Sequence, residues 1–342
     1  MSRRTDPVHC IFTGFADVPV SYTPRPGFRS GHWMTIYCWG APRKLTLPPA
    51  EERLFQVTSD TQVLAHIYWQ EERRSHPTLL ALHGLEGSST AHYMRGIAQK
   101  ALAAGFNVVL LNQRNCGGTE HLGPGLYHSG LTEDAAHVIR ALARDGLERI
   151  VVAGYSLGGN LALKLAGEHS PQTLPSLTAV CAVSPVLDLE ACVRSLERRP
   201  NVIYQWNFVR NLKARMRRKN AVFPRGFDLS RLSAIHSVRA FDAAYTAPHF
   251  GFQSAEDYYY RASALRVASR IQVPALVITA KDDPFVPVAP FADPALTSNP
   301  NITVVVTEHG GHCGFLGVPG NGDDGYWAEG AIVAFARAAA RC

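Results

Sequence analysis

The sequence predicts an α/β fold, with a mostly parallel central sheet flanked by helices and with one helical insertion. Short apolar strands alternate with amphipathic helices, which implies right-handed crossovers between parallel strands. One strand runs directly into a G-x-S-x-G turn and a helix, at residues 149–164. The alternation breaks once, over residues 188–264, which are polar, basic in places and helical in pattern. The 342 residues, 46% of them hydrophobic, suffice for one large α/β domain with an insertion.

Composition excludes several classes of protein. The net charge of +6 is modest for this length, and no nucleic-acid-binding motif accompanies it, so we expect no nucleic-acid partner. The seven cysteines are scattered and odd in number, and the start, MSRRTDPVHC, does not resemble a signal peptide. These features favour free thiols in a reducing cytoplasm. No apolar run reaches the ~18–20 residues of a membrane span, so we expect no transmembrane segment.

Residues 1–50 are rich in Pro, Gly and aromatic residues and show weak periodicity. We expect an N-terminal arm that packs on the core, because Trp33, Tyr37 and Trp39 argue against full disorder.

The core itself is expected in two parts, residues 51–187 and 265–342, separated by a mostly helical cap at 188–264. An insertion at the carboxyl ends of the parallel strands would lie over the G-x-S-x-G turn. The expected strands are 53–58, 63–68, 78–82, 107–111, 150–153, 178–183, 275–280 and 302–307. The expected core helices are 92–104, 132–144, the helix after the G-x-S-x-G turn and a final helix from about Gly325.

The chemistry centres on Gly154-Tyr155-Ser156-Leu157-Gly158. A sharp turn between a buried strand and a helix strains its central residue, and the glycines two positions away prevent collisions where the backbones crowd. Such a nucleophile elbow presents the Ser156 hydroxyl at the carboxyl edge of the sheet. The helix behind it offers free N–H groups and the positive end of a dipole. Ser156 is therefore the candidate nucleophile.

Acyl transfer also requires backbone N–H donors for the developing oxyanion. In elbow enzymes one donor follows the nucleophile and the other lies in an HG-type loop after an earlier strand. Here the loop is His83-Gly84-Leu85-Glu86-Gly87, so the expected donors are Leu85 and Leu157. We expect the His83 side chain to support the loop rather than to react.

The serine needs a base and the base an orienting carboxylate, in the chain order Ser, Asp or Glu, His. His312 follows the last strand, and two glycines before it give the loop freedom; His309 is the alternative base. For the acid, Pro284 favours an extended Asp283, whereas Asp282 would cap the following turn. Asp188 is a third candidate. The predicted catalytic residues are Ser156, Asp283 and His312.

At this point the sequence resembles a known family. LHGLEGSS, LNQRNCGGTE, GYSLGGN, AFDAAYTAPHFGF, AKDDPFVP and GGHCGF follow one another between His32 and Phe315. Together they are similar to the YheT-like branch of the α/β-hydrolase superfamily, whose relatives include embryogenesis-associated and lipid-cleaving proteins. The resemblance implies an α/β-hydrolase fold with a cap, carboxylester hydrolysis, the same three catalytic residues and an HGLEG oxyanion loop.

The expected function is therefore a serine carboxylester hydrolase, esterase- or lipase-like, acting through an acyl-enzyme on a short- to medium-chain acyl ester or lipid. The alternatives are an acyltransferase that passes the acyl group to an alcohol, and a catalytically silent ligand-binding protein. We expect no cofactor. We also expect no metal, because neither Cys116 with His121 nor the His309, His312 and Cys313 group has a second ligand pair. Substrate-binding residues and oligomeric state are not assigned by the sequence.

One further expectation concerns residues 201–220. Val202, Trp206, Val209 and Met216 recur at helical spacing, interleaved with Arg and Lys residues, among them Arg215. This pattern predicts a helix with one apolar and one cationic face. Either the apolar face covers the sheet edge while the cations are solvated, or the cationic face attracts anionic lipid in a peripheral contact.

Overall fold

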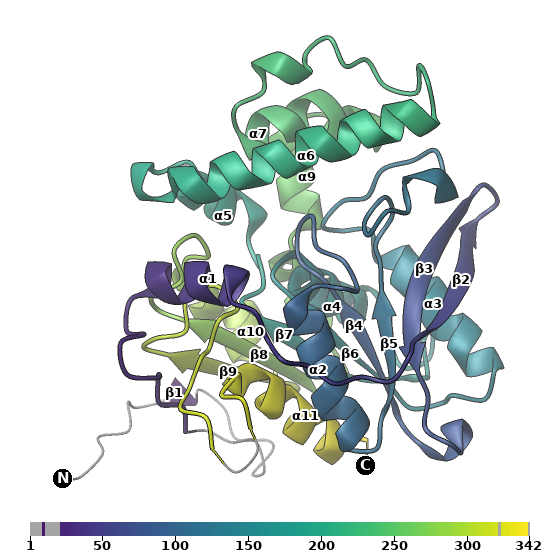
Figure 1. Cartoon of the computed structure of the whole chain (residues 1–342), viewed down its shortest axis with the longest axis vertical. Coiled ribbons are helices and arrows are strands. Elements are labelled where there is room, and N and C mark those ends of the chain that lie inside the picture. Colours follow the sequence, from purple (N-terminus) through teal and green to yellow (C-terminus); the bar gives the residue numbers. More distant parts are fainter. Residues whose placement is uncertain (1–8, 11–20, 321–322, 341–342) are drawn as a thin grey trace.

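The computed structural model describes residues 9–10, 21–320 and 323–340, and their central feature is a nine-stranded sheet in the order β1-β9-β8-β7-β6-β4-β5-β3-β2 (Figure 1). Neighbours from β5 through β4, β6, β7 and β8 to β9 are parallel, and β1, β3 and β2 add antiparallel edges. The strands are β1 His9–Cys10, β2 Glu51–Thr58, β3 Thr61–Tyr68, β4 Thr78–Leu82, β5 Asn107–Leu111, β6 Ile150–Tyr155, β7 Leu177–Val183, β8 Ala275–Ala280 and β9 Ile302–Thr307. The predicted mostly parallel sheet is confirmed.

Helices cover both faces of this sheet, because the central strands alternate apolar side chains between two cores. Leu79 and Ala81 of β4 pack with α2 (His92–Ala103) and α11 (Trp327–Ala339). Leu80 and Leu82 face the opposite core, with α3 (Thr132–Arg144), α4 (Leu157–Glu168) and α10 (Pro294–Thr297). Strands buried on both faces read as continuous apolar runs, which is why the sequence located them to within two residues.

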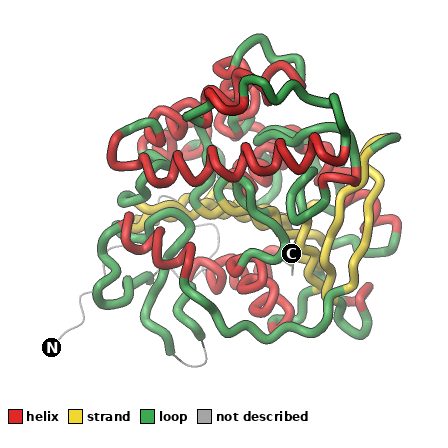
Figure 2. The backbone as a smooth tube through the Cα atoms, turned by 45° about the horizontal axis from the view of Figure 1, so that its top comes forward, coloured by secondary structure: helices red, strands yellow, loops and turns green. Residues whose placement is uncertain are grey.

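A second layer of helices lies beyond the carboxyl edge of the parallel strands (Figures 1 and 2). It consists of α5 (Leu189–Leu196), α6 (Val202–Val222), α7 (Val238–Phe241), α8 (Ala247–His249) and α9 (Ala255–Ala262). The long helix α6 crosses much of the width of the molecule above the loops that follow β4 and β5 (Figure 1).

The sequence did not predict the helix α1 (Gly31–Gly40) within the N-terminal arm. Its N-cap is Ser30, whose hydroxyl accepts from the Trp33 N–H at 3.4 Å. The following stretch is anchored to α11, because buried Arg43 donates to Glu329 at 2.6 and 2.8 Å. Helix α1 lies beside the N-terminal half of α6 (Figure 1), where His32 stacks on Tyr204 at 5.7 Å between ring centroids.

No helix within residues 21–320 and 323–340 is both long enough and apolar enough to cross a membrane.

Candidate active site

The G-x-S-x-G segment joins β6 to α4 through a single strained residue. Ser156 has φ 54° and ψ −115°, a left-handed backbone conformation that non-glycine residues rarely adopt. A side chain on Gly154 would overlap the backbone of Gly158, and one on Gly158 would overlap the backbone at Leu82. The two glycines are therefore needed for this close approach, and the strain is concentrated on the serine that lies at the carboxyl edge of the sheet.

Two tyrosines fix the HGLEG loop on either side of Leu85. The Gly84 N–H donates to the Tyr93 hydroxyl at 3.1 Å, and the Glu86 N–H donates to the Tyr127 hydroxyl at 3.0 Å. Glu86 has φ 57°, so the loop turns sharply after Leu85. A Cβ on Gly84 would lie 3.3 Å from the Ser156 Cβ, so this loop runs directly against the elbow.

Leu157 is the first residue of α4, where an N–H has no acceptor within the helix. Leu157 and Leu85 both line a cavity that also contains Ser156. Their backbones thus lie on the two segments that meet at the serine.

His83 is fully buried beneath the loop, and its hydrogen bonds fix its tautomer. The Gln113 N–H donates to Nε2 at 3.1 Å, so Nδ1 carries the proton and donates to the Gly84 carbonyl at 2.7 Å. Burial lowers the pKa of His83 to about 4, which keeps the ring neutral. The prediction that His83 supports the loop is confirmed.

The loop after β9 brings His312 to Asp283, which follows β8. His312 Nδ1 lies 2.9 Å from an Asp283 carboxylate oxygen, and the Asp283 side chain has no solvent exposure. The other Asp283 oxygen accepts from the Phe285 and Val286 N–H groups at 3.1 and 2.9 Å. The carboxylate is therefore held from two sides and faces the imidazole.

Asp282 has a different role from the one expected. The sequence suggested that it caps the following turn, but Asp283 makes those hydrogen bonds. Asp282 instead accepts from the Gly311 N–H at 2.9 Å and lies 3.3 Å from His309 Nδ1. Asp283 thus contacts the His312 ring, whereas Asp282 holds the loop that carries His312.

The remaining candidates lie elsewhere. His309 pairs with Asp282, and Asp188 is the N-cap of α5, where it accepts from the Ala191 N–H at 3.0 Å. The described residues contain no group of three or more His, Cys, Asp or Glu side chains arranged to hold a metal ion.

The protonation of His312 is set by opposing effects. Burial disfavours the charged imidazolium, but the neighbouring Cys313 and the Asp283 carboxylate outweigh it and raise the pKa of His312 to about 10. Cys313 has φ 58°, and its N–H donates to the Ser184 hydroxyl at 3.1 Å. Cys313 also lines the cavity beside Ser156.

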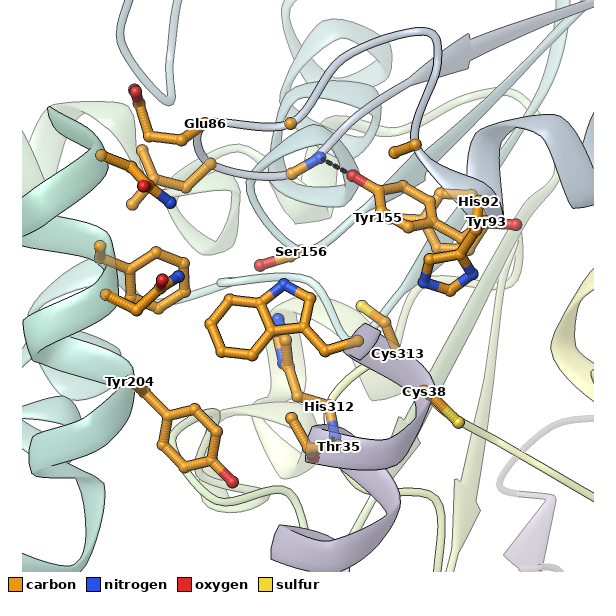
Figure 3. Close-up of a pocket in the computed structure, with 18 of the residues that line it drawn as sticks. Thr35, Cys38, Glu86, His92, Tyr93, Tyr155, Ser156, Tyr204, His312 and Cys313 are labelled. Atoms are coloured by element: carbon orange, nitrogen blue, oxygen red, sulfur yellow. Dashed lines mark hydrogen bonds between the residues drawn. The ribbon is translucent and has the colours of Figure 1, made fainter. Parts of the chain in front are cut away.

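Ser156 and His312 line one cavity of about 340 Å³, which opens between α1, α6 and the HGLEG loop (Figure 3). Thr35 of α1 contributes to the same wall, and its hydroxyl accepts from the His312 N–H at 2.8 Å. The sequence carried no signal for Thr35 or Tyr127, because each acts through a hydrogen bond to a distant segment. Only the position of Tyr93, shortly after the HGLEG loop, could have drawn attention to it.

Helix α6 corrects the expected pattern of one apolar and one cationic face. Val202 and Trp206 are 60% and 61% exposed, whereas Arg215 is buried. The Arg215 guanidinium lies 2.9 Å from the Glu86 carboxylate and over the Tyr127 ring.

The other buried cation of α6, Lys219, holds the loop after β5. Lys219 is also buried and donates to Asn115 Oδ1 at 2.6 Å and to the Glu120 carbonyl at 2.8 Å. Helical periodicity predicted the spacing of the residues correctly. Arg215 and Lys219 nevertheless face the core, because their acceptors are buried there.

Comparison with known proteins agrees with this fold. A sequence profile of the family described as alpha/beta hydrolase fold matches residues 77–318. The chain is 36% identical over 303 residues to the esterase-type protein YheT of Escherichia coli (strain K12), covering 86% of this chain and 87% of that protein. It is 28% identical over 306 residues to the phospholipase ABHD3 of Mus musculus, covering 83% of this chain and 73% of the relative.

Among solved structures, the 2,6-dihydroxy-pseudo-oxynicotine hydrolase superposes with a TM-score of 0.56 and 18% sequence identity, over 84% of this chain and 68% of that one. At this identity the likeness shows the fold alone. The profile match and the 36% identity to YheT go further. The chain belongs to the YheT-like branch of the α/β-hydrolase superfamily.

Proposed function

We propose that this protein is a serine carboxylester hydrolase that works through an acyl-enzyme, with Ser156 as nucleophile, His312 as base and Asp283 as the orienting carboxylate. The observation that carries the proposal is the 2.9 Å contact between His312 Nδ1 and Asp283, with Ser156 lining the same cavity as His312. The esterase and phospholipase names of the relatives support an acyl ester or lipid as substrate.

The arrangement leaves His312 Nε2 to exchange protons. In the first step Ser156 Oγ attacks the ester carbonyl carbon, and its proton passes to Nε2. The N–H groups of Leu85 and Leu157 donate to the oxyanion. When the intermediate collapses, the carbon–oxygen bond to the alcohol breaks and Nε2 returns the proton to the leaving oxygen. Water then repeats the sequence, which releases the carboxylic acid and restores Ser156.

Removal of the nucleophile tests this proposal. Ser156→Ala should lower p-nitrophenyl ester turnover by about 10³–10⁶-fold, because the acyl-enzyme cannot form. A fluorophosphonate probe should label the wild-type protein at Ser156 and leave the variant unlabelled. Ser298→Ala, which changes an exposed serine at the end of α10, is the matched control. Full turnover by purified Ser156→Ala protein would contradict the mechanism. A separate analysis of the products formed in the presence of added alcohol measures acyl transfer to an acceptor other than water.

The second part of the proposal is a peripheral contact with anionic lipid, through a different surface of α6 from the one first expected. The exposed face of this helix carries Ile203 and Trp206 near its N-terminus, followed by Arg210 and Arg217. Trp39 of α1 is 45% exposed, and its ring centroid lies 6.2 Å from that of Tyr204 of α6. Apolar side chains beside a cavity mouth, with cations along the same helix, suit an anionic lipid surface.

The cytoplasmic location stays a prediction. Five cysteines of the described residues are free thiols, in keeping with a reducing compartment: Cys38, Cys116, Cys181, Cys192 and Cys313.

A further inference from the structure

Two cavities, rather than one, meet at Ser156. The larger, of about 340 Å³, is lined by His312 and by polar residues such as Asn207 and Asn211 (Figure 3). The smaller, of about 90 Å³, is lined by Leu157 and not by His312. Four residues line both: Leu85, Ser156, Phe208 and Phe285. The serine therefore stands at the junction of two spaces with different chemistry.

The smaller cavity is closed by helices of the insertion. The inner face of α5 supplies residues at positions i, i+3, i+4 and i+7, and α6 and α7 add one leucine and one valine. These side chains are all 3–8% exposed: Leu189, Cys192, Val193, Leu196, Leu212 and Val238. The carboxyl group in the lining, that of Asp242, already accepts hydrogen bonds from Tyr259 and Thr246 at 2.8 and 2.7 Å. The walls thus offer an almost wholly apolar surface, suited to a hydrocarbon chain.

We propose that the smaller cavity binds the acyl chain and the larger cavity binds the alcohol part of the ester. The assignment rests on the proposed function and on the position of the imidazole. His312 must protonate the leaving oxygen, so the alcohol has to depart on the side of Ser156 where His312 lies. The acyl chain extends from the same carbonyl carbon in another direction, and the cavity without His312 is the space available to it.

The volumes then define the substrate class. A cavity of about 150 Å³ in another protein holds one benzene ring, with six carbon atoms. On that scale the small cavity of about 90 Å³ holds about four carbon atoms beyond the carbonyl group. The large cavity has almost four times that volume and is partly polar, so it accepts a longer or bulkier alcohol. The substrate is therefore a short-chain acyl ester of a larger alcohol.

A pair of isomeric esters tests the assignment without a difference in overall hydrophobicity. Octyl butanoate carries its long chain on the alcohol, whereas butyl octanoate carries it on the acyl group. We expect kcat/KM for octyl butanoate to exceed that for butyl octanoate by at least tenfold, because methylenes beyond the volume of the small apolar cavity cost affinity for the transition state. Equal values, or the reverse order, would overturn the assignment.

Variants of the cavity walls extend the test. Leu212→Ala enlarges only the small cavity. It should reduce the ratio of kcat/KM for octyl butanoate to kcat/KM for butyl octanoate at least fivefold. Val193→Phe fills the same cavity and should shift the preferred p-nitrophenyl ester towards acetate. Asn211→Ala, on the neighbouring residue of α6, lines only the large cavity and should leave the preferred acyl length unchanged. A changed acyl preference in Asn211→Ala alone would also refute the assignment.

Fluorophosphonate labelling distinguishes a failure of the acyl-cavity assignment from a failure of the proposed function, because it reports a folded, reactive Ser156 in every variant. Labelled wild-type protein with no acyl-length preference would refute the acyl cavity and leave the proposed function intact. Unlabelled wild-type protein would refute the proposed function itself.

Discussion

At the scale of single residues, neighbouring side chains of the same type have different roles. Asp283 contacts the His312 ring, whereas Asp282 holds Gly311 and pairs with His309. The difference follows from the loop after β8, in which the two consecutive carboxylates meet different partners. A carboxylate that orients a base and one that positions a loop should respond differently to the loss of charge.

We therefore predict that Asp283→Asn lowers kcat for ester hydrolysis by about 10⁴-fold, because an amide favours the wrong imidazole tautomer. Asp282→Asn should cost about tenfold or less, since it weakens only the support of the loop. Steady-state kinetics on one p-nitrophenyl ester measures both. A larger loss at Asp282 would reverse the assignment of the two carboxylates.

The raised pKa of His312 predicts the pH dependence. A general base must be neutral, so kcat/KM should rise with pH and continue to rise above pH 6.5, towards the pKa of about 10. Asp283→Asn and Cys313→Ala each remove a cause of the raised pKa, so both should move this limb to lower pH. Since the pKa is raised in the folded state, protonated His312 stabilises the fold below pH 6.5, and that contribution is lost as the pH rises through about 10. An unchanged profile in both variants would show that another group controls it.

At the scale of elements, α6 combines three surfaces in one helix. Its inner side supplies Leu212 to the small cavity, and its buried cations Arg215 and Lys219 tie it to the loops after β4 and β5. Its outer side is apolar near Trp206 and cationic at Arg217. Replacing Arg215 would break a buried ion pair with Glu86, so lipid binding has to be tested on the outer residues.

We expect Arg210→Gln/Arg217→Gln to lose binding to phosphatidylglycerol vesicles, and Ile203→Gln/Trp206→Gln to weaken the same binding by removing the apolar contact. Salt should suppress the wild-type binding, because exposed charges are screened within about 8–10 Å. Vesicle co-sedimentation at low and high salt measures this.

The control for the cationic variant is Arg95→Gln/Arg337→Gln, which removes the same charge from exposed positions on α2 and α11. Wild-type protein that fails to sediment with anionic vesicles, or a control that loses as much binding, would exclude a specific surface on α6.

At the scale of the whole molecule, distant parts of the chain meet at one loop. His312 is oriented by Asp283 after β8, its backbone is held by Thr35 of α1, and Cys313 bonds to Ser184 after β7. The arm that bears Thr35 is itself anchored to α11 through Arg43 and Glu329. The position of the base therefore depends on segments almost 280 residues apart in the sequence.

This arrangement predicts that Thr35→Val impairs catalysis from within the N-terminal arm. The His312 N–H would lose its acceptor, at a cost of about 1–3 kcal/mol. We expect kcat to fall about tenfold, while Thr35→Ser, which keeps the hydroxyl, retains activity. Kinetics and urea unfolding of the two variants measure the effect. Wild-type kcat in Thr35→Val would show that α1 does not position the base.

The sequence by itself determined eight strands of the sheet, the long helices that cover it and the candidates Ser156, His312 and Asp283. Those features depend on local patterns: apolar strands buried on both faces, glycines required by a strained turn, and the order of motifs along the chain. The ambiguity between Asp282 and Asp283 could not be removed that way, because both follow the same strand.

Tertiary structure alone decided which side chains face each other. It turned Arg215 and Lys219 inward, inserted α1 beside the site, and divided the space at Ser156 into two cavities. The physical reason is that hydrogen bonds, ion pairs and cavity walls join segments far apart in the chain, so no local pattern encodes them. Periodicity gives the spacing of residues on a helix, and only the partners available in the fold decide which face is buried.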